Sequence, residues 1–247
     1  MHRMGLVLLL TAFVASGCGD DNGSTPDTKA TMDSGPAADT GAPSAAFKGL
    51  DPYSVAKGEL TIDTETTGDL TKVELLVDGK VVVSVTAAPF SLKWDTTKTQ
   101  DGIRKLSLKA HGTAASATSD ERPVVVLNNG EEATFAEPST MTMTITPGVD
   151  NHVKIHWTMP VGIKKVISVL SWKNSEFKME IAIGTGNCPH SGEKAADATS
   201  DTSPVVVEYG GTANLASVMW FTHAGATNEA ELAGKSAEVT LKAFLLK

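Results

Sequence analysis

The residues best suited to chemistry are Cys188 and His190, two apart in the glycine-rich segment GTGNCPHSG. Thiolate sulfur and imidazole nitrogen are ligands that zinc and copper prefer. His152 and His156 lie four apart in HVKIHW, which reads as a strand, so we expect their side chains to share a face. His223 ends another predicted strand. One candidate function is therefore a metal-binding or accessory enzyme component that uses the Cys188/His190 loop.

The alternative is a structural turn. Gly184, Gly186, Pro189 and Gly192 favour a tight loop in which Cys188 packs as a small hydrophobic residue. The Cys-x-His spacing is unusual for zinc, and the sequence contains neither a CxxC pair nor HExxH. A thiol nucleophile would also need a base and an orienting group, and no local protease signature indicates them. We favour the turn, expect no cofactor, and predict that the chain is not an enzyme.

Aromatic residues of the second half allow a different kind of site. Trp157, Trp172, Trp220 and Tyr209 could form a platform for stacking sugars or could fill a core. Trp157 and Trp172 each end an alternating strand, on the side of its apolar residues or at its edge. We therefore favour core packing for these rings.

The elements that must position such residues are β-strands. In KVELLVDGKVVVSV, apolar side chains alternate with polar ones, and Asp78-Gly79 supplies the positive φ angles of a tight hairpin. The alternation predicts that several residues share an inner face, namely Val73, Leu75, Val77, Val81, Val83, Val85, Phe90, Leu92, Trp94, Leu106, Leu108 and Ala110. Short strands separated by turn residues are typical of a sandwich.

Four short motifs of this region carry a family resemblance: Val77-Asp78-Gly79, Ala88-Pro89-Phe90, Trp94-Asp95-Thr96 and Asp101-Gly102. Their order and spacing are similar to those of bacterial immunoglobulin-like domains, over about 48–128. The resemblance implies a β-sandwich that acts as a spacer or binding module on an exported protein. It implies no catalytic residues.

The second half has a similar strand pattern after Asn128-Asn129-Gly130. Seven segments read as strands: MTMTITP, HVKIHW, VISVLSW, FKMEIAI, PVVVEY, SVMWFTH and AEVTLKAF. Their layout loosely resembles a pre-peptidase C-terminal sandwich, and a jelly roll is also compatible. We therefore predict an all-β chain with two β-sandwich domains.

The N-terminus indicates export. Arg3 precedes the apolar stretch Leu6–Val14, which is too short to span a membrane, and small residues follow it. Ala15-Ser16-Gly17-Cys18 resembles the lipobox of bacterial lipoproteins. That resemblance implies cleavage before Cys18, a diacylglycerol on its sulfur, and an acyl chain such as palmitate on the new amine. The alternative is an ordinary signal peptide followed by a chance cysteine.

The predicted organisation has four parts. Residues 1–17 form the signal peptide, and 18–46 form the lipidated cysteine with a disordered tether rich in Gly, Ser, Thr, Pro and Asp. Residues 47–128 form the immunoglobulin-like domain, and 129–247 the second sandwich. We expect a lipid anchor in the bacterial cell envelope, at the periplasmic or surface face of the outer membrane.

Composition narrows the partners. The formal charge of −8 and the absence of a basic cluster argue against nucleic acid. Only two cysteines are present, so a lipidated Cys18 would leave Cys188 without an intramolecular partner. We expect a non-catalytic module that contacts the membrane through its lipid and presents its distal domain to a protein or a glycan.

Overall fold

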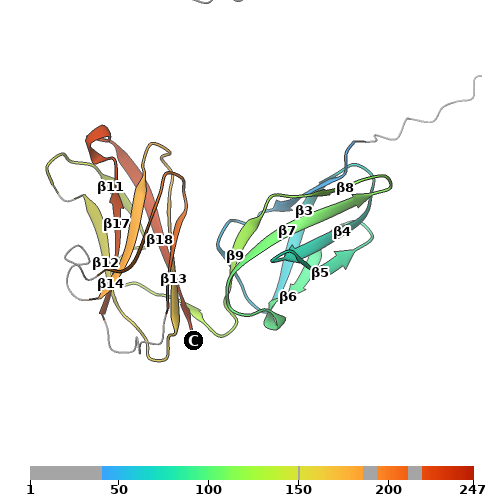
Figure 1. Ribbon diagram of the computed structural model, residues 1–247, viewed down its shortest axis with the longest axis horizontal. Helices are drawn as coiled ribbons and strands as arrows, with labels where there is room; N and C mark the ends of the chain where they lie inside the picture. Colours follow the sequence, from blue (N-terminus) through green and yellow to red (C-terminus); the bar gives the residue numbers. More distant parts are fainter. Residues whose placement is uncertain (1–40, 150, 186–193, 211–218) are drawn as a thin grey trace, which may run out of the picture. The chain divides into compact units, whose positions relative to one another are not determined.

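The computed structural model describes residues 41–149, 151–185, 194–210 and 219–247 (Figure 1). These ranges contain β-strands and two short 3-10 helices, η1 (Thr96–Lys98) and η4 (Glu229–Glu231). The predicted all-β class is confirmed. None of the described residues forms a helix that is long and apolar enough to cross a bilayer. The predicted signal peptide, Cys18 and most of the predicted tether lie outside the described residues.

Strands of the first half form two sheets that share one core. The larger sheet has the order β2 (Ser54–Ala56), β9 (Arg122–Val126), β7 (Gly102–Gly112), β4 (Leu70–Val77) and β5 (Lys80–Val85), with β8 (Ser116–Thr118) also paired to β7. The smaller sheet has the order β1 (Ser44–Lys48), β3 (Glu59–Thr67) and β6 (Leu92–Asp95). Most pairs are antiparallel, whereas β2 and β9 are parallel.

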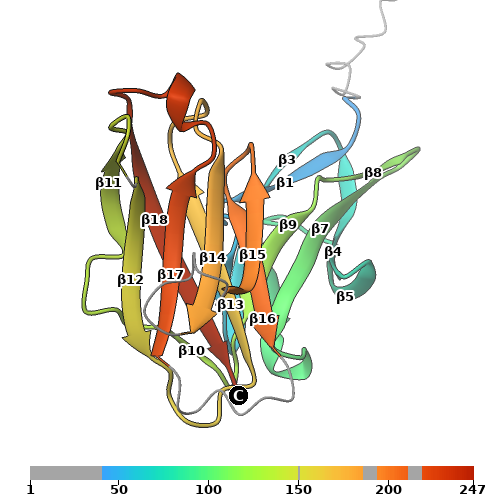
Figure 2. The same ribbon diagram turned by 60° about the vertical axis from the view of Figure 1, so that its left-hand side comes forward.

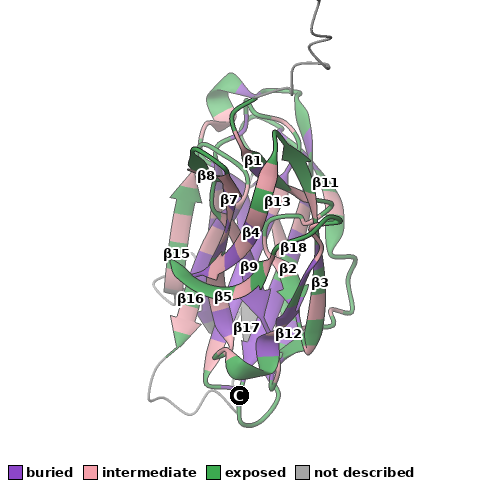
Figure 3. Ribbon diagram, turned by 90° about the vertical axis from the view of Figure 1, so that its right-hand side faces the viewer, coloured by how far each residue is buried: buried purple, intermediate pink, exposed green. Residues whose placement is uncertain are grey.

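Side-chain alternation builds this first core as predicted. Val73, Leu75, Leu106 and Leu108 are fully buried on β4 and β7, and Trp94 of β6 is 2% exposed. Figure 3 shows such buried positions in purple along the strands. The period of two puts every second residue of a strand on the same face, which explains the pattern.

The β4–β5 hairpin differs from the prediction in one respect. Asp78 and Gly79 have positive φ angles of 49° and 77°, as the tight turn requires. However, Val81 is 52% exposed, although the alternation placed it inside. Leu75 pairs with Val83 but Leu76 pairs with Val81, so Val82 is an extra residue in a β-bulge. The bulge reverses the side-chain alternation, and Val81 therefore faces outward.

The second half also forms two sheets. One has the order β10 (Glu131–Glu132), β18 (Ser236–Leu246), β13 (Lys165–Trp172) and β16 (Val205–Gly210), with β11 (Thr140–Thr144) also paired to β18. The other has the order β12 (His152–Thr158), β17 (Met219–Ala226), β14 (Met179–Thr185) and β15 (Lys194–Ser200). Figure 2 shows β12, β17, β14 and β15 side by side. A single apolar cluster, which includes Ile155, Leu170, Phe177 and Val239, fills the space between the sheets.

A third apolar cluster covers the outer face of β13 and β18. Its buried members are Val125, Leu127, Ile167, Val169, Phe244 and Leu246. Val124 and Val126 point instead into the first core, and Val166 and Leu170 into the second. The runs PVVVL and KVISVL are therefore buried on both faces, which explains why they are continuously apolar rather than alternating.

The chain from Asp39 to Lys247 forms one compact unit. Strand β1 begins at Ser44, inside the segment for which the sequence predicted a tether. Strand β9 ends at Val126 and β10 begins at Glu131, on either side of the predicted division at 128/129. That these halves are independent domains stays a prediction.

Candidate functional site

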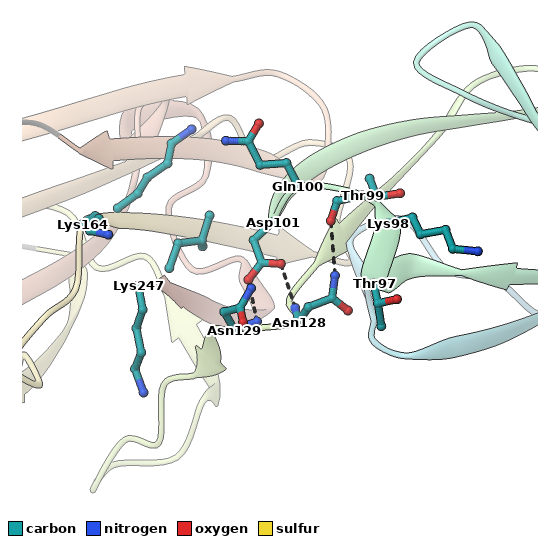
Figure 4. A pocket seen from close by; sticks show the side chains of 11 residues that line it. Thr97, Lys98, Thr99, Gln100, Asp101, Asn128, Asn129, Lys164 and Lys247 are labelled. Atoms are coloured by element: carbon teal, nitrogen blue, oxygen red, sulfur yellow. Dashed lines mark hydrogen bonds between the residues drawn. The ribbon is translucent and has the colours of Figure 1, made fainter.

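A polar cavity of about 510 Å³ lies where η1 and its following loop meet the 128–129 segment and the ends of β13 and β18 (Figure 4). Five uncharged polar residues line it: Thr97, Thr99, Gln100, Asn128 and Asn129. Leu246 is its apolar member, and no aromatic residue is among the described residues that line it. This lining favours hydrogen bonding over stacking.

Asp101 fixes one wall of the cavity. Its carboxylate accepts hydrogen bonds from the backbone N–H groups of Asn128 (2.9 Å), Asn129 (2.8 Å) and Gly130 (3.2 Å). Figure 4 shows the Asp101 carboxylate directed at this segment. Both carboxylate oxygens are used in these bonds, so Asp101 is committed to the backbone and is not an available general base.

Asn128 fixes the second wall through buried polar contacts. Its amide oxygen accepts from the hydroxyl of Thr96 (2.8 Å), which is fully buried. Its amide nitrogen donates to the carbonyl oxygens of Thr96 (2.8 Å) and Thr99 (3.3 Å). Together with Asp101, this network holds the segment between β9 and β10 in one conformation, because a buried polar group is stable only when it is bonded.

Lysine ammonium groups supply the positive charge around the cavity. Three of them are in ion pairs with carboxylates: Lys98 with Asp95 (3.3 Å), Lys165 with Glu208, and Lys247 with Glu131 (3.5 Å). Lys164 has no such partner among the residues that the structure describes. The charges therefore largely cancel, and the cavity suits a polar, nearly neutral ligand better than a polyanion.

Only two of the four candidate metal ligands, His152 and His156, lie within the described part of the chain. Cys188 and His190 lie outside the described residues. His152 and His156 do share a face of β12, since Ile155 and Trp157 on the other face are buried. Four residues along a strand nevertheless span about 13 Å, so the two imidazoles cannot bind one ion side by side. No group of three His, Cys, Asp or Glu residues in the described ranges could hold a metal.

The backbone of His223 pairs with Lys154 on one side and Ala182 on the other. Trp157 and Trp172 are 8% and 6% exposed and belong to the second core, so the preference for core packing is confirmed for both. Tyr209 packs half-buried against the same core. The side chain of Trp220 lies outside the described ones.

Sequence reasoning missed the Asp101 and Asn128 network. The segment Asn128-Asn129-Gly130 indicated only a break between two strand patterns. The available signal was the pair Asp101-Gly102, which is typical of a turn, and turn aspartates commonly accept from backbone N–H groups nearby in the chain. Which N–H groups it accepts from could not be read from the spacing.

With this geometry established, the chain can be compared with known proteins. Residues 51–108 match the family described as bacterial Ig domain. The matched segment runs from the loop before β2 into β7, and so covers most of the larger sheet of the first half. No protein of curated function matches the chain significantly.

Three solved structures show a distant likeness to the chain. The fibronectin(III)-like modules of Clostridium thermocellum CbhA are 13% identical, with a TM-score of 0.32, 80% of this chain covered and 92% of that one. A structure described as a carbohydrate-binding module of the β-sandwich superfamily is 9% identical, with a TM-score of 0.29 and coverages of 84% and 99%. The endo-β-1,4-mannanase from Thermotoga petrophila is 16% identical at a TM-score of 0.31, over 35% of this chain, which spans only 20% of the enzyme. At these TM-scores, the likenesses carry no conclusion about this chain.

Proposed function

We propose that this chain is a lipid-anchored protein of the bacterial cell envelope that presents its β-sandwiches as a non-catalytic binding module. The match of residues 51–108 to bacterial Ig domains supports a binding or adhesion role. Ala15-Ser16-Gly17-Cys18 supports the anchor, because small residues directly before a cysteine are what lipoprotein processing requires. The lipid holds the chain at the membrane without a spanning helix.

The polar cavity is the observation that carries the binding role. Asp101 and Asn128 fix the backbone of its walls, so no loop has to be ordered when a ligand binds, although the free side chains still do. The side chains of Gln100, Asn129 and Lys164 make no hydrogen bond within the described part of the chain. These groups can donate to and accept from a polar ligand, either a glycan or a protein loop.

The binding role is tested with the full chain in detergent. An oligosaccharide array and capture from an extracellular protein fraction would identify the ligand class. A Gln100→Ala/Asn129→Ala double variant removes the free amides without touching the Asp101 bonds, and we expect it to weaken binding about tenfold. Asp120→Ala is the matched control, because its exposed carboxylate makes no hydrogen bond or ion pair with any described residue. Equal binding by the double variant and the control would refute a role for this cavity.

The anchor is tested by fractionation. Cys18→Ser removes the acceptor sulfur, and we expect the variant to leave the membrane fraction. A variant that stays membrane-bound would contradict lipid attachment at this position.

A further inference from the structure

A second hollow, of about 340 Å³, lies between the Asp51–Tyr53 turn and the outer face of β13 and β18. Val169, Ser171, Thr240 and Lys242 form its floor. It shares none of its lining residues with the polar cavity. We call this hollow the Tyr53 groove.

The floor is rigid because it is made of two hydrogen-bonded strands. Val169 pairs directly with Lys242, and Ser171 with Thr240, across the β13–β18 ladder. Directly paired residues of antiparallel strands lie side by side on one face. The backbone positions that carry an apolar side chain, two hydroxyls and a lysine are therefore fixed. The Ser171 hydroxyl donates to the Thr240 carbonyl (3.4 Å), and the Thr240 hydroxyl is hydrogen-bonded to that of Thr140 (3.0 Å).

Tyr53 is held in an unusual backbone conformation at the side of the groove. Its φ angle is +58°, in the left-handed region that residues with a Cβ rarely adopt. Its N–H donates to the carbonyl of Pro123 (2.7 Å), and the Ser54 hydroxyl donates to the carbonyl of Asp51 (2.6 Å), so the turn is fixed on both sides. A residue with a Cβ keeps this conformation only where its surroundings offset the backbone strain.

Packing of the Tyr53 ring offsets part of the backbone strain. The Tyr53 ring lies half-buried against the apolar cluster that contains Val125 and Ile167. Burial, followed by the negative charge of Glu208, raises the pKa of the Tyr53 phenol, so its hydroxyl stays protonated at neutral pH. The remaining exposed part of the residue lines the groove.

The groove thus combines apolar surface with polar groups, and a sugar ring can contact both. Tyr53, Pro52, Pro204 and Val169 offer apolar surface for the C–H face of a pyranose ring. Asp51 and Lys242 are exposed and take part in no ion pair with any described residue, so an acceptor and a donor are free at the rim. Their opposite charges favour a neutral ligand, and the volume is at the small end of ligand sites.

We propose that the Tyr53 groove binds a short neutral saccharide, with the Tyr53 ring as its stacking surface and Ser171 and Lys242 as hydrogen-bonding groups. This rests on the proposed binding function and adds a ligand class and a second site. The opposite charges of Asp51 and Lys242 would also suit a peptide, but hydroxyl groups on paired strands next to an aromatic ring favour a sugar.

The test uses the full chain on an array of immobilised neutral, acidic and amino oligosaccharides, followed by calorimetry with the best soluble neutral one. Lys242→Ala and Ser171→Ala keep the Tyr53 packing, and we expect each to weaken binding five- to tenfold. Tyr53→Phe keeps the ring and should bind within threefold of the wild type, whereas Tyr53→Leu should lose at least tenfold. Asp120→Ala, which lines neither hollow, is the matched control and should leave this binding unchanged.

Three results would overturn the proposal: no neutral saccharide binds, Lys242→Ala and Tyr53→Leu both bind like the wild type, or only a peptide competes for the groove. The proposed function would survive each of them if a protein ligand were captured through the polar cavity. Failure of both cavities to bind anything would instead refute the proposed function itself.

Discussion

Loss of the Asp101 carboxylate should destabilise the fold by about 2–3 kcal/mol. The carboxylate accepts three backbone N–H groups, at 2.9, 2.8 and 3.2 Å. Hydrogen bonds to a charged group contribute about 1.5–3 kcal/mol each, and we assign about 1 kcal/mol to each here because Asp101 is partly exposed to solvent. Asp101→Ala therefore removes about three such contributions and leaves three N–H groups to water.

Urea denaturation followed by tryptophan fluorescence measures this change, with Asp120→Ala as the control that should stay within about 0.5 kcal/mol of the wild type. Asp101→Asn keeps the shape of the side chain but only one acceptor oxygen, so we expect an intermediate loss of about 1–2 kcal/mol. Amide hydrogen exchange should rise at least about tenfold at Asn128, Asn129 and Gly130 in Asp101→Ala. Stability within 0.5 kcal/mol of the wild type, with unchanged exchange at these amides, would refute the reasoning.

Three further predictions concern stability. Glu74 accepts hydrogen bonds from Lys72 (2.7 Å) and His111 (2.8 Å), and these lower the pKa of its carboxyl, Lys72 most. The Glu74 carboxylate therefore stabilises the fold above its ordinary pKa of 4.5, and this stabilisation is lost as the pH falls through its lowered pKa. Glu74→Gln should cost about 1 kcal/mol of unfolding free energy at pH 7 and progressively less in thermal melts at acid pH. A cost that does not change with pH would contradict this. Phe244→Ala empties a fully buried position of the third apolar cluster and should cost about 3–5 kcal/mol in urea; a cost below about 1 kcal/mol would mean that this cluster contributes little. In Gly79→Ala, the added Cβ meets no neighbouring atom, but the alanine must adopt a φ of +77°. We therefore expect thermal melts to show a loss of about 1 kcal/mol in stability. Unchanged stability would argue against the tight turn.

Alternation in the sequence predicted most of the strands but not their irregularities. The inner faces of β4 and β7 followed directly from Val73, Leu75, Leu106 and Leu108, because burial on one face imposes a period of two. The bulge at Val82 could not be predicted, since three consecutive valines fit either register. Strand β15, whose sequence is KAADATS, was missed because it has little apolar character and lies at a sheet edge.

The candidate sites were predictable only in part. A continuous apolar run such as VISVL indicates burial on both faces, and that signal could have identified the third cluster. The Tyr53 groove combines Asp51–Tyr53 with Val169 and Lys242, which are more than a hundred residues away along the chain. The groove forms only because the Asp51–Tyr53 turn lies against the outer face of β13 and β18, and the spacing of residues along the chain does not predict that contact.

The most direct test of the central claim, a lipid-anchored envelope protein, is the intact mass of the N-terminal peptide from protein purified out of the membrane fraction. Our account predicts that residues 1–17 are missing, that the peptide starts at Cys18, and that it carries the added mass of a diacylglycerol and an amide-linked acyl chain. A peptide that starts elsewhere, or one with an unmodified Cys18, would contradict the account.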